Sequence, residues 1–178
     1  MFRFFIVVIS FVALPAQAEI YLTQSQALEV VFGEECMQSY EPKIITPDIR
    51  SALKKEGLLG EPEAKNAHFF VCKDRNAKIT GYALIDEEVG KHLPITYIVG
   101  ISPAGRATRV EMMVFREIRG WEVRERKFMA QFEGKNGKDD LSIGHGISNI
   151  TGATLSSRAI AKGVARALFL WARFYGTT

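Results

Sequence analysis

Residues 95–115 read ITYIVGISPAGRATRVEMMVF and predict two strands joined by a tight turn. Apolar residues alternate in residues 95–101 and again in residues 108–115, as in strands with one buried face. Residues 102–106 contain proline and glycine, which favour a turn. Strands joined this closely must be antiparallel, because a parallel crossover needs about a dozen residues or more. The side chains expected on one face are Ile95, Tyr97, Val99 and Ile101 in the first strand and Val110, Met112 and Val114 in the second.

Further strands and helices are expected on both sides of this pair. A polar turn at residues 73–78 separates two apolar stretches and predicts a hairpin of residues 68–72 with 79–85. The expected helices cover residues 23–32, 46–57 and 157–174, with a polar helical segment at residues 123–132. Helices at both ends of a run of antiparallel strands define the α+β class, an antiparallel β-sheet flanked by helices.

Apolar spacing predicts which helix faces are buried. In the first helix the spaced apolar residues are Ala27, Val30 and Val31, and in the second they are Ile49 and Leu53. The last helix has an apolar stripe of Ile160, Val164, Ala167, Leu168 and Trp171. It also has a basic stripe of Arg158, Lys162 and Arg166, of which the last two are expected on a solvated face.

The N-terminus has the pattern of an export signal. Arg3 precedes the apolar residues 4–14, and Ala16-Gln17-Ala18 fits a small-x-small cleavage site. This predicts a signal peptide at residues 1–18, a mature domain at residues 19–178 and a periplasmic location. An uncleaved membrane anchor is the alternative, although the apolar run is shorter than the ~20 residues that span a bilayer.

Composition excludes some classes of function. The net charge of +3 is small for a protein that follows a phosphate backbone, so no nucleic-acid partner is expected. The three histidines are far apart and in no metal-ligand spacing, so no metal is expected. Cys36 and Cys72 form either a disulfide, which export would permit, or two buried thiols.

The most distinctive stretch for chemistry is NITGATLSS, residues 149–157, at the start of the last helix. A helix N-terminus has unsatisfied N–H groups and the positive end of the dipole, which suit a phosphate. Gly152 and Ala153 leave room for a bulky anion. On these residues alone, simple helix capping by a hydroxyl is the competing interpretation.

This stretch resembles the flavinylation motif of the FMN-binding domain family, which includes flavin subunits of the sodium-pumping NADH:quinone oxidoreductase and of Rnf-type complexes. The motif core reads Ser/Thr-Gly-Ala-Thr, and here it is Thr151-Gly152-Ala153-Thr154. In that family a flavin transferase links FMN through its phosphate to the last Thr. The resemblance implies FMN as the cofactor, Thr154 as the attachment residue and a single FMN-binding domain.

The resemblance extends over residues 79–170 in the family's order. It includes Gly81-Tyr82-Ala83-Leu84, Gly90-Lys91-His92 with Pro94-Ile95, Pro103 with Gly105, Glu117 with Gly120-Trp121-Glu122, and Phe128 with Gln131-Phe132 and Gly134. The cofactor-binding residues that it implies are Thr154, Thr151, Gly152, Ala153, Leu155, Ser156, Ser157, Glu117 and Trp121. Glu117 and Trp121 have alternatives as a solvated loop carboxylate and a core contact. No catalytic nucleophile–base pair is evident.

One position departs from the family's pattern. The family usually has Asp six residues before the modified Thr, where this chain has Ser148. That Asp belongs to the recognition pattern of the transferase, so the departure leaves open whether FMN is attached covalently.

The resemblance implies an exported electron-transfer flavoprotein rather than a stand-alone catalyst. Its expected partners are a flavin transferase for loading and a membrane-bound or multihaem redox protein. Two alternatives remain: a flavin-dependent periplasmic reductase of a small molecule, and a cofactor-free interaction or assembly module of the same fold.

Overall fold

The computed structural model describes residues 18–60 and 64–176, so residues 1–17 of the predicted signal peptide lie outside the described part. In chain order the elements are β1 (Glu19–Ile20), α1 (Gln24–Phe32), β2 (Met37–Ile44), α2 (Pro47–Lys55), β3 (Asn66–Lys73), β4 (Ile79–Val89), β5 (Pro94–Ile101), β6 (Ala107–Phe115), the short 3-10 helix η1 (Trp121–Arg124), α3 (Arg126–Met129), the 3-10 helix η2 (Ala130–Phe132) and α4 (Thr154–Phe174).

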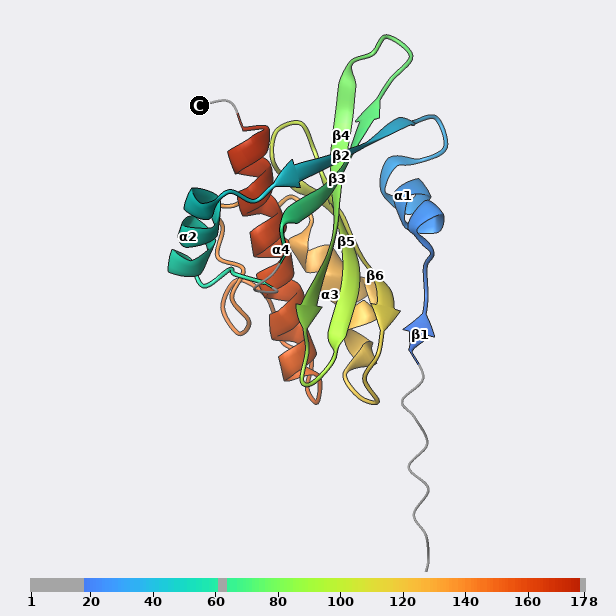
Figure 1. Ribbon diagram of the computed structural model, residues 1–178. Coiled ribbons are helices and arrows are strands. Elements are labelled where there is room, and N and C mark those ends of the chain that lie inside the picture. The colour runs from blue at the N-terminus through green and yellow to red at the C-terminus, as the bar shows by residue number, and fades with distance from the viewer. Residues whose placement is uncertain (1–17, 61–63, 177–178) are drawn as a thin grey trace, which may run out of the picture.

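The six strands form one antiparallel sheet in the order β1-β6-β5-β4-β3-β2. The long helix α4 packs along one face of the sheet, and α1 covers part of the other (Figure 1). The predicted α+β class, an antiparallel sheet flanked by helices, is confirmed. The predicted hairpin is present as β3 and β4, and the predicted strand pair as β5 and β6.

The alternation predicted for β5 is confirmed, since its odd-numbered side chains from residue 95 to residue 101 lie in the core under α4. In β6 the expected alternation fails beyond Met112. A bulge leaves Met113 without a partner between Met112, opposite Tyr97, and Val114, opposite Thr96. Val114 therefore packs on the α1 side of the sheet, and its expected place beside Met112 was wrong.

The first two predicted helices are present. The α1 N-terminus has a capping box, in which Thr23 Oγ1 accepts from the Gln26 amide at 3.3 Å and Gln26 Oε1 accepts from the Thr23 amide at 2.9 Å. Ala27 and Leu28 are the buried residues of α1, whereas Val30, expected on that face, is exposed. In α2 the two expected residues, Ile49 and Leu53, are buried.

The segment after β6 differs from the polar helix expected at residues 123–132. It forms three short helical turns, η1, α3 and η2, that pack against β6. Val123, Phe128 and Phe132 are almost fully buried in the core, so the segment is a lid of that core rather than a solvated helix.

The basic stripe of α4 is not solvated along its length. Arg166 is only 3% exposed, and its Nε lies 2.7 Å from Asp86 Oδ2 on β4. The same guanidinium bonds Glu88 and donates to the Tyr97 hydroxyl at 2.9 Å. Lys162 Nζ lies 3.0 Å from Glu88 Oε1. The expectation of a solvated face at Arg166 was wrong, because its carboxylate partners come from a strand distant in sequence.

The sheet has one long edge strand that the sequence did not predict, β2. It pairs with β3 over its whole length, from Met37 opposite Lys73 to Ile44 opposite Asn66. Cys36, just before β2, forms a disulfide with Cys72 of β3, with 5.5 Å between the Cα atoms. Of the two possibilities for these cysteines, the structure has the disulfide. Within residues 18–60 and 64–176, no helix is both long and apolar enough to cross a bilayer.

Candidate functional site

The site begins at the first turn of α4, where Thr154 is the first helical residue. The N-cap is Ala153, which has no side-chain cap, so none of the nearby hydroxyls is used in capping. Gly152 precedes it with φ +87°, a conformation that suits glycine and turns the chain into the helix. The Thr154 hydroxyl oxygen instead accepts a hydrogen bond from the Asn149 side-chain amide at 2.9 Å.

A cavity of about 690 Å³ opens beside this turn. Three segments that are distant in sequence form its wall: the β4–β5 connection, the loop after β6, and the start of α4. Its lining residues are Lys91, His92, Leu93, Arg116, Glu117, Ile118, Arg119, Gly152, Ala153, Thr154, Leu155 and Ser156. The volume lies in the range of about 300–1,000 Å³ that is usual for ligand pockets.

Glu117 fixes one side of the cavity. Its Oε1 accepts hydrogen bonds from the backbone amides of His92 at 2.6 Å and Leu93 at 3.0 Å. A Cβ at Gly90 would lie 2.9 Å from the same oxygen, so glycine lets the turn close around the carboxylate. Glu117 therefore joins the β4–β5 connection to the loop after β6.

A second close approach joins the loop after β6 to α4. Gly120 has φ +96°, and a Cβ there would lie 2.3 Å from Ser156 Oγ. Ser156 is almost fully buried. The glycine thus allows this loop to lie directly against the first turn of α4 and to close the cavity wall.

The wall combines positive charge with apolar surface. Lys91 and Arg119 are exposed cations, whereas Arg116 is held by the Thr96 hydroxyl at 2.9 Å and Glu87 at 3.3 Å. The apolar side chains on the wall are Leu93, Ile118 and Leu155. A helix N-terminus beside cations attracts a phosphate, and the apolar side chains suit a flat aromatic ring.

The structure brings six of the nine residues implied by the family resemblance to this cavity: Thr154, Gly152, Ala153, Leu155, Ser156 and Glu117. Thr151 is exposed in the turn just before them and is not part of the wall. Ser157 is fully buried, and its hydroxyl has no hydrogen-bond partner among the described residues. Trp121 lies outside the cavity, with the guanidinium carbon of Arg124 5.6 Å from its ring centroid.

Asn149, Lys91, Arg116, Ile118 and Arg119 were not assigned a role from the sequence. Asn149 belongs to the quoted motif stretch, and Lys91 belongs to a segment that resembles the family, so both carried a signal. The other three lie within two residues of Glu117, which was assigned to the site. Ser148, which replaces the family's Asp, is exposed, and its backbone amide donates to Gln131 Oε1 at 2.7 Å.

These features define an α+β domain with a nucleotide-sized cavity at a helix N-terminus. The model of the family described as FMN-binding domain matches residues 90–169 of the chain. The match runs from the β4–β5 connection into α4 and contains the whole cavity wall. The strands β1 to β4 lie outside the match but belong to the same sheet as β5 and β6.

Comparison with solved structures supports the fold. The chain resembles the crystal structure of Shewanella oneidensis NqrC, with a TM-score of 0.55 and 15% sequence identity, over 85% of this chain and 90% of that one. No curated protein matches the chain.

FMN is the cofactor of the matched family, and the residues present fit it. The cavity has a volume suited to a ligand of this class, a threonine hydroxyl not used in capping, and both cationic and apolar side chains. Within the described residues no group of histidine, cysteine or acidic side chains could hold a metal ion.

Proposed function

We propose that this protein is an exported flavoprotein that transfers electrons, with FMN attached through its phosphate to Thr154 Oγ1. The observation that carries the proposal is the position of Thr154. Its hydroxyl lies on the wall of a cavity inside the matched FMN-binding segment and does not cap the helix that it begins. The isoalloxazine of FMN, when bound, supplies the redox chemistry.

The protein's own residues bind and orient. Thr154 provides the oxygen of the phosphoester bond, and the Asn149 amide holds that oxygen in place at 2.9 Å. The N-terminus of α4 and the cations Lys91 and Arg119 stabilise the negative charge of the phosphate. Glu117 keeps the β4–β5 connection closed on the cavity through its two amide contacts.

Export and a periplasmic location are part of the proposal. The predicted cleavage site after Ala18 directly precedes β1, whose residues Glu19 and Ile20 pair with Phe115 and Val114 of β6. The disulfide between Cys36 and Cys72 is also of the kind that persists in an oxidising compartment.

The proposed partners follow from the same function. A flavin transferase would load the domain, and a membrane-bound or multihaem redox protein would exchange electrons with it. The fold neighbour NqrC and the resemblance of the sequence to flavin subunits of membrane complexes support this choice.

Intact mass spectrometry after co-expression with a flavin transferase tests the proposal. The wild-type mass should exceed that of the apoprotein by one FMN minus one water, and Thr154→Ala should remove the increase entirely. An adduct that persists in Thr154→Ala would assign the bond to another residue. An unmodified wild type that also releases no flavin on denaturation would reject both FMN binding and the electron-transfer function.

The departure at Ser148 has its own test. If the missing Asp limits recognition by the transferase, Ser148→Asp should raise the fraction of flavinylated protein at a fixed time of co-expression. Because Ser148 is exposed and its side chain has no hydrogen bond within the described residues, the change should leave folding intact. A wild type that is already fully loaded would show that this Asp is dispensable here.

A further inference from the structure

We propose that the mouth of the flavin cavity is a docking surface for an acidic patch on the partner redox protein. The docking surface consists of the cations Lys91 and Arg119 and the apolar residues Leu93, Ile118 and Leu155, all on the cavity wall. The proposal rests on the proposed function, because it names the chemistry of the partner that would exchange electrons at this cavity.

The two cations of the docking surface are unpaired. Lys91 and Arg119 are exposed, and neither forms a hydrogen bond or ion pair within residues 18–60 and 64–176. Arg116, beside them, has its charge met by Glu87 at 3.3 Å. Glu117 points an oxygen at two backbone amides. A phosphate diester on Thr154 would add one negative charge, which is less than the charge that Lys91 and Arg119 carry together.

The apolar residues of the docking surface are unusually exposed for their size. Ile118 is 83% exposed, Leu155 46% and Leu93 38%. Exposed apolar side chains gathered beside cations are typical of a protein interface, with an apolar centre and a polar rim. A small anion would use the cations alone and would gain nothing from Ile118. This combination therefore favours a protein with carboxylates around its own redox centre.

Electron transfer needs only a short-lived encounter, and such complexes have small interfaces. Opposite charge at the two surfaces speeds the encounter and orients it, whereas like charge repels wrong partners. The cations stand on the wall that holds Thr154, so an acidic partner would be drawn to the place where the flavin is attached. Opposite charge therefore favours the orientation in which the partner's redox centre faces the flavin.

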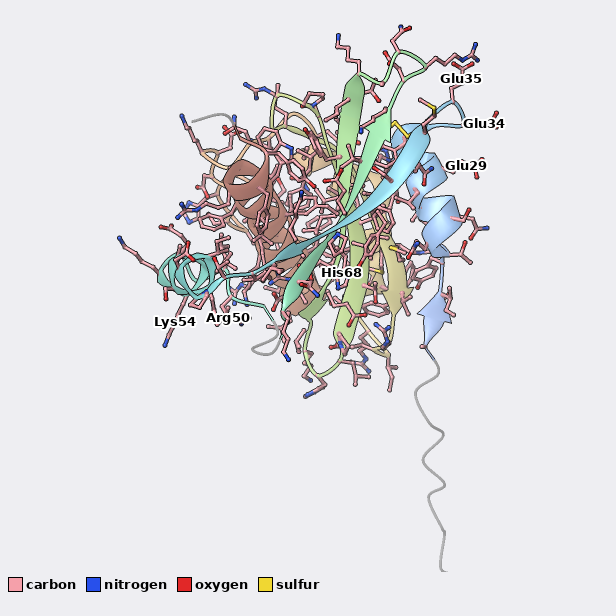
Figure 2. The ribbon with its side chains drawn as sticks, turned by 45° about the horizontal axis from the view of Figure 1, so that its top comes forward. Glu29, Glu34, Glu35, Arg50, Lys54 and His68 are labelled. Atoms are coloured by element: carbon pink, nitrogen blue, oxygen red, sulfur yellow. A yellow bond between two sulfur atoms is a disulfide. The ribbon has the colours of Figure 1, made fainter. Side chains whose placement is uncertain are left out.

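Acidic side chains gather at one end of α1, and a second group of cations lies on α2. Figure 2 shows Glu29, Glu34 and Glu35 together around the end of α1, well away from α2, where Arg50 and Lys54 lie. Lys54 and Lys55 on α2 give a matched control, because α2 contributes nothing to the cavity wall. Reversing their charges changes the net charge of the protein by the same amount as reversing Lys91 and Arg119.

Binding to the unloaded protein is the first test. The probes are native ferricytochrome c, whose surface lysines are positive, and succinylated ferricytochrome c, whose modified lysines are negative. Both probes carry the same haem. Isothermal titration calorimetry at low ionic strength should give binding for the succinylated form only. The double variant Lys91→Glu/Arg119→Glu should raise the Kd about tenfold or more, and Lys54→Glu/Lys55→Glu should leave it within about twofold.

The apolar part of the surface has a separate variant. Ile118→Ser should weaken binding of succinylated cytochrome c about threefold to tenfold without changing its salt dependence, because it removes contact area and no charge. Equal losses in the Lys91/Arg119 and Lys54/Lys55 variants would overturn the proposal, since they would show that only net charge matters. Equal binding of native and succinylated cytochrome c would overturn it as well.

Electron transfer from the loaded protein is the second test, in samples matched for FMN content. Each reduced flavin gives one electron to each of two ferric haems and releases its protons to solvent. The rate constant should be larger for succinylated than for native cytochrome c and should fall as salt is added. With hexacyanoferrate(III), a small anion, Ile118→Ser should slow the reaction less than it slows the reduction of succinylated cytochrome c. An equal slowing with hexacyanoferrate(III) would indicate a small-anion site and would overturn the protein-docking proposal.

The two proposals fail in different ways. Absence of an FMN adduct and of released flavin would reject the proposed function, and the calorimetric test would still decide whether the surface binds acidic protein. If the protein is loaded with FMN and reducible, but substitution of Lys91 and Arg119 changes neither the rates nor the affinities, only the docking proposal is rejected.

Discussion

The first turn and the middle of α4 differ in how their polar side chains are used: one is accessible to a ligand, and the other is buried in ion pairs. In the first turn Thr154 carries an accessible hydroxyl at the cavity, and its only described side-chain bond is with Asn149. In the middle, Arg166 is buried among carboxylates and a phenol. The difference shows how a residue such as Thr154 can be held in a fixed position while its hydroxyl stays accessible to a ligand. The middle fixes the helix to the sheet, so the Thr154 side chain is not needed to anchor the helix.

The strength of the middle contacts depends on complete pairing. The Arg166 guanidinium and the Glu88 carboxylate are withdrawn from water, and Asp86 is partly buried. Burial of charge is tolerated only when each charge has partners. Arg166 also donates to the Glu87 carbonyl at 2.7 Å, so its donors are used on the sheet. Removal of one of these three side chains should therefore destabilise the fold by more than the intact ion pairs stabilise it.

The largest expected effect is that of Arg166→Met. It should lower the free energy of unfolding by about 3–5 kcal/mol, because Asp86 and Glu88 would lose their shared buried cation. Urea unfolding monitored by circular dichroism measures this. Arg158→Met, on the exposed part of the same stripe, should stay within about 0.5 kcal/mol of wild type. Similar losses for both variants would mean that the buried ion pairs do not hold α4.

Gly163→Ala should have the next largest effect. A Cβ at Gly163 would lie 2.3 Å from the Tyr97 hydroxyl oxygen, and Tyr97 is fully buried and cannot withdraw. Overpacking of this kind costs about 1–3 kcal/mol, more than alanine gains in helix propensity. Gly137→Ala is the control, since its Cβ would meet only Leu168 Cβ at 4.0 Å. Stabilisation by Gly163→Ala would show that α4 can shift on the sheet.

Alkaline pH should loosen the middle of α4 by a smaller amount. Burial raises the pKa of the Tyr97 phenol well above its ordinary value of 10.0. Below pH 10 this tyrosine is neutral in both folded and unfolded chains. Above pH 10 only the unfolded chain loses the proton, so stability should fall by about 1.4 kcal/mol per pH unit from this group. In Tyr97→Phe the slope of stability against pH should be shallower by that amount; an unchanged slope would refute the assignment.

The smallest effect on stability is expected for Thr154→Ala in the unloaded protein. It should change the free energy of unfolding by no more than about 0.5 kcal/mol, because it removes one exposed hydrogen bond at a helix end. The same variant should lose the FMN adduct entirely. A loss of more than about 2 kcal/mol would show that the first turn also anchors the helix, and the contrast between the two regions would fail.

Much of the fold could be predicted because alternation is a local signal. Residues 95–101 carry a period-2 pattern and form β5 as expected. The bulge in β6 could not be predicted, since Met112, Met113 and Val114 are all apolar and the pattern does not show which one is extra. The edge strand β2 was missed because Glu41, Pro42 and Lys43 interrupt any apolar alternation.

The site was predictable where a motif is contiguous and not where the fold assembles it. Thr154 was found from its neighbours in sequence. Lys91 and Arg119 meet it only because two connections close on the start of α4. Trp121 follows Gly120 in sequence, but the structure places it away from the cavity wall. Arg166 was misjudged for a related reason, since its partners Asp86 and Glu88 lie 80 and 78 residues away.

The long free edge of the sheet has a consequence for how these domains coexist at high concentration. An unpaired strand edge can recruit a second chain and start a growing β-assembly. In β2 the middle of that edge is occupied by Pro42, which lacks an amide hydrogen, between the charged Glu41 and Lys43. The disulfide from Cys36 secures the strand's beginning against a slip in register. The residues that hid β2 from prediction are those that protect the protein from polymerising through it.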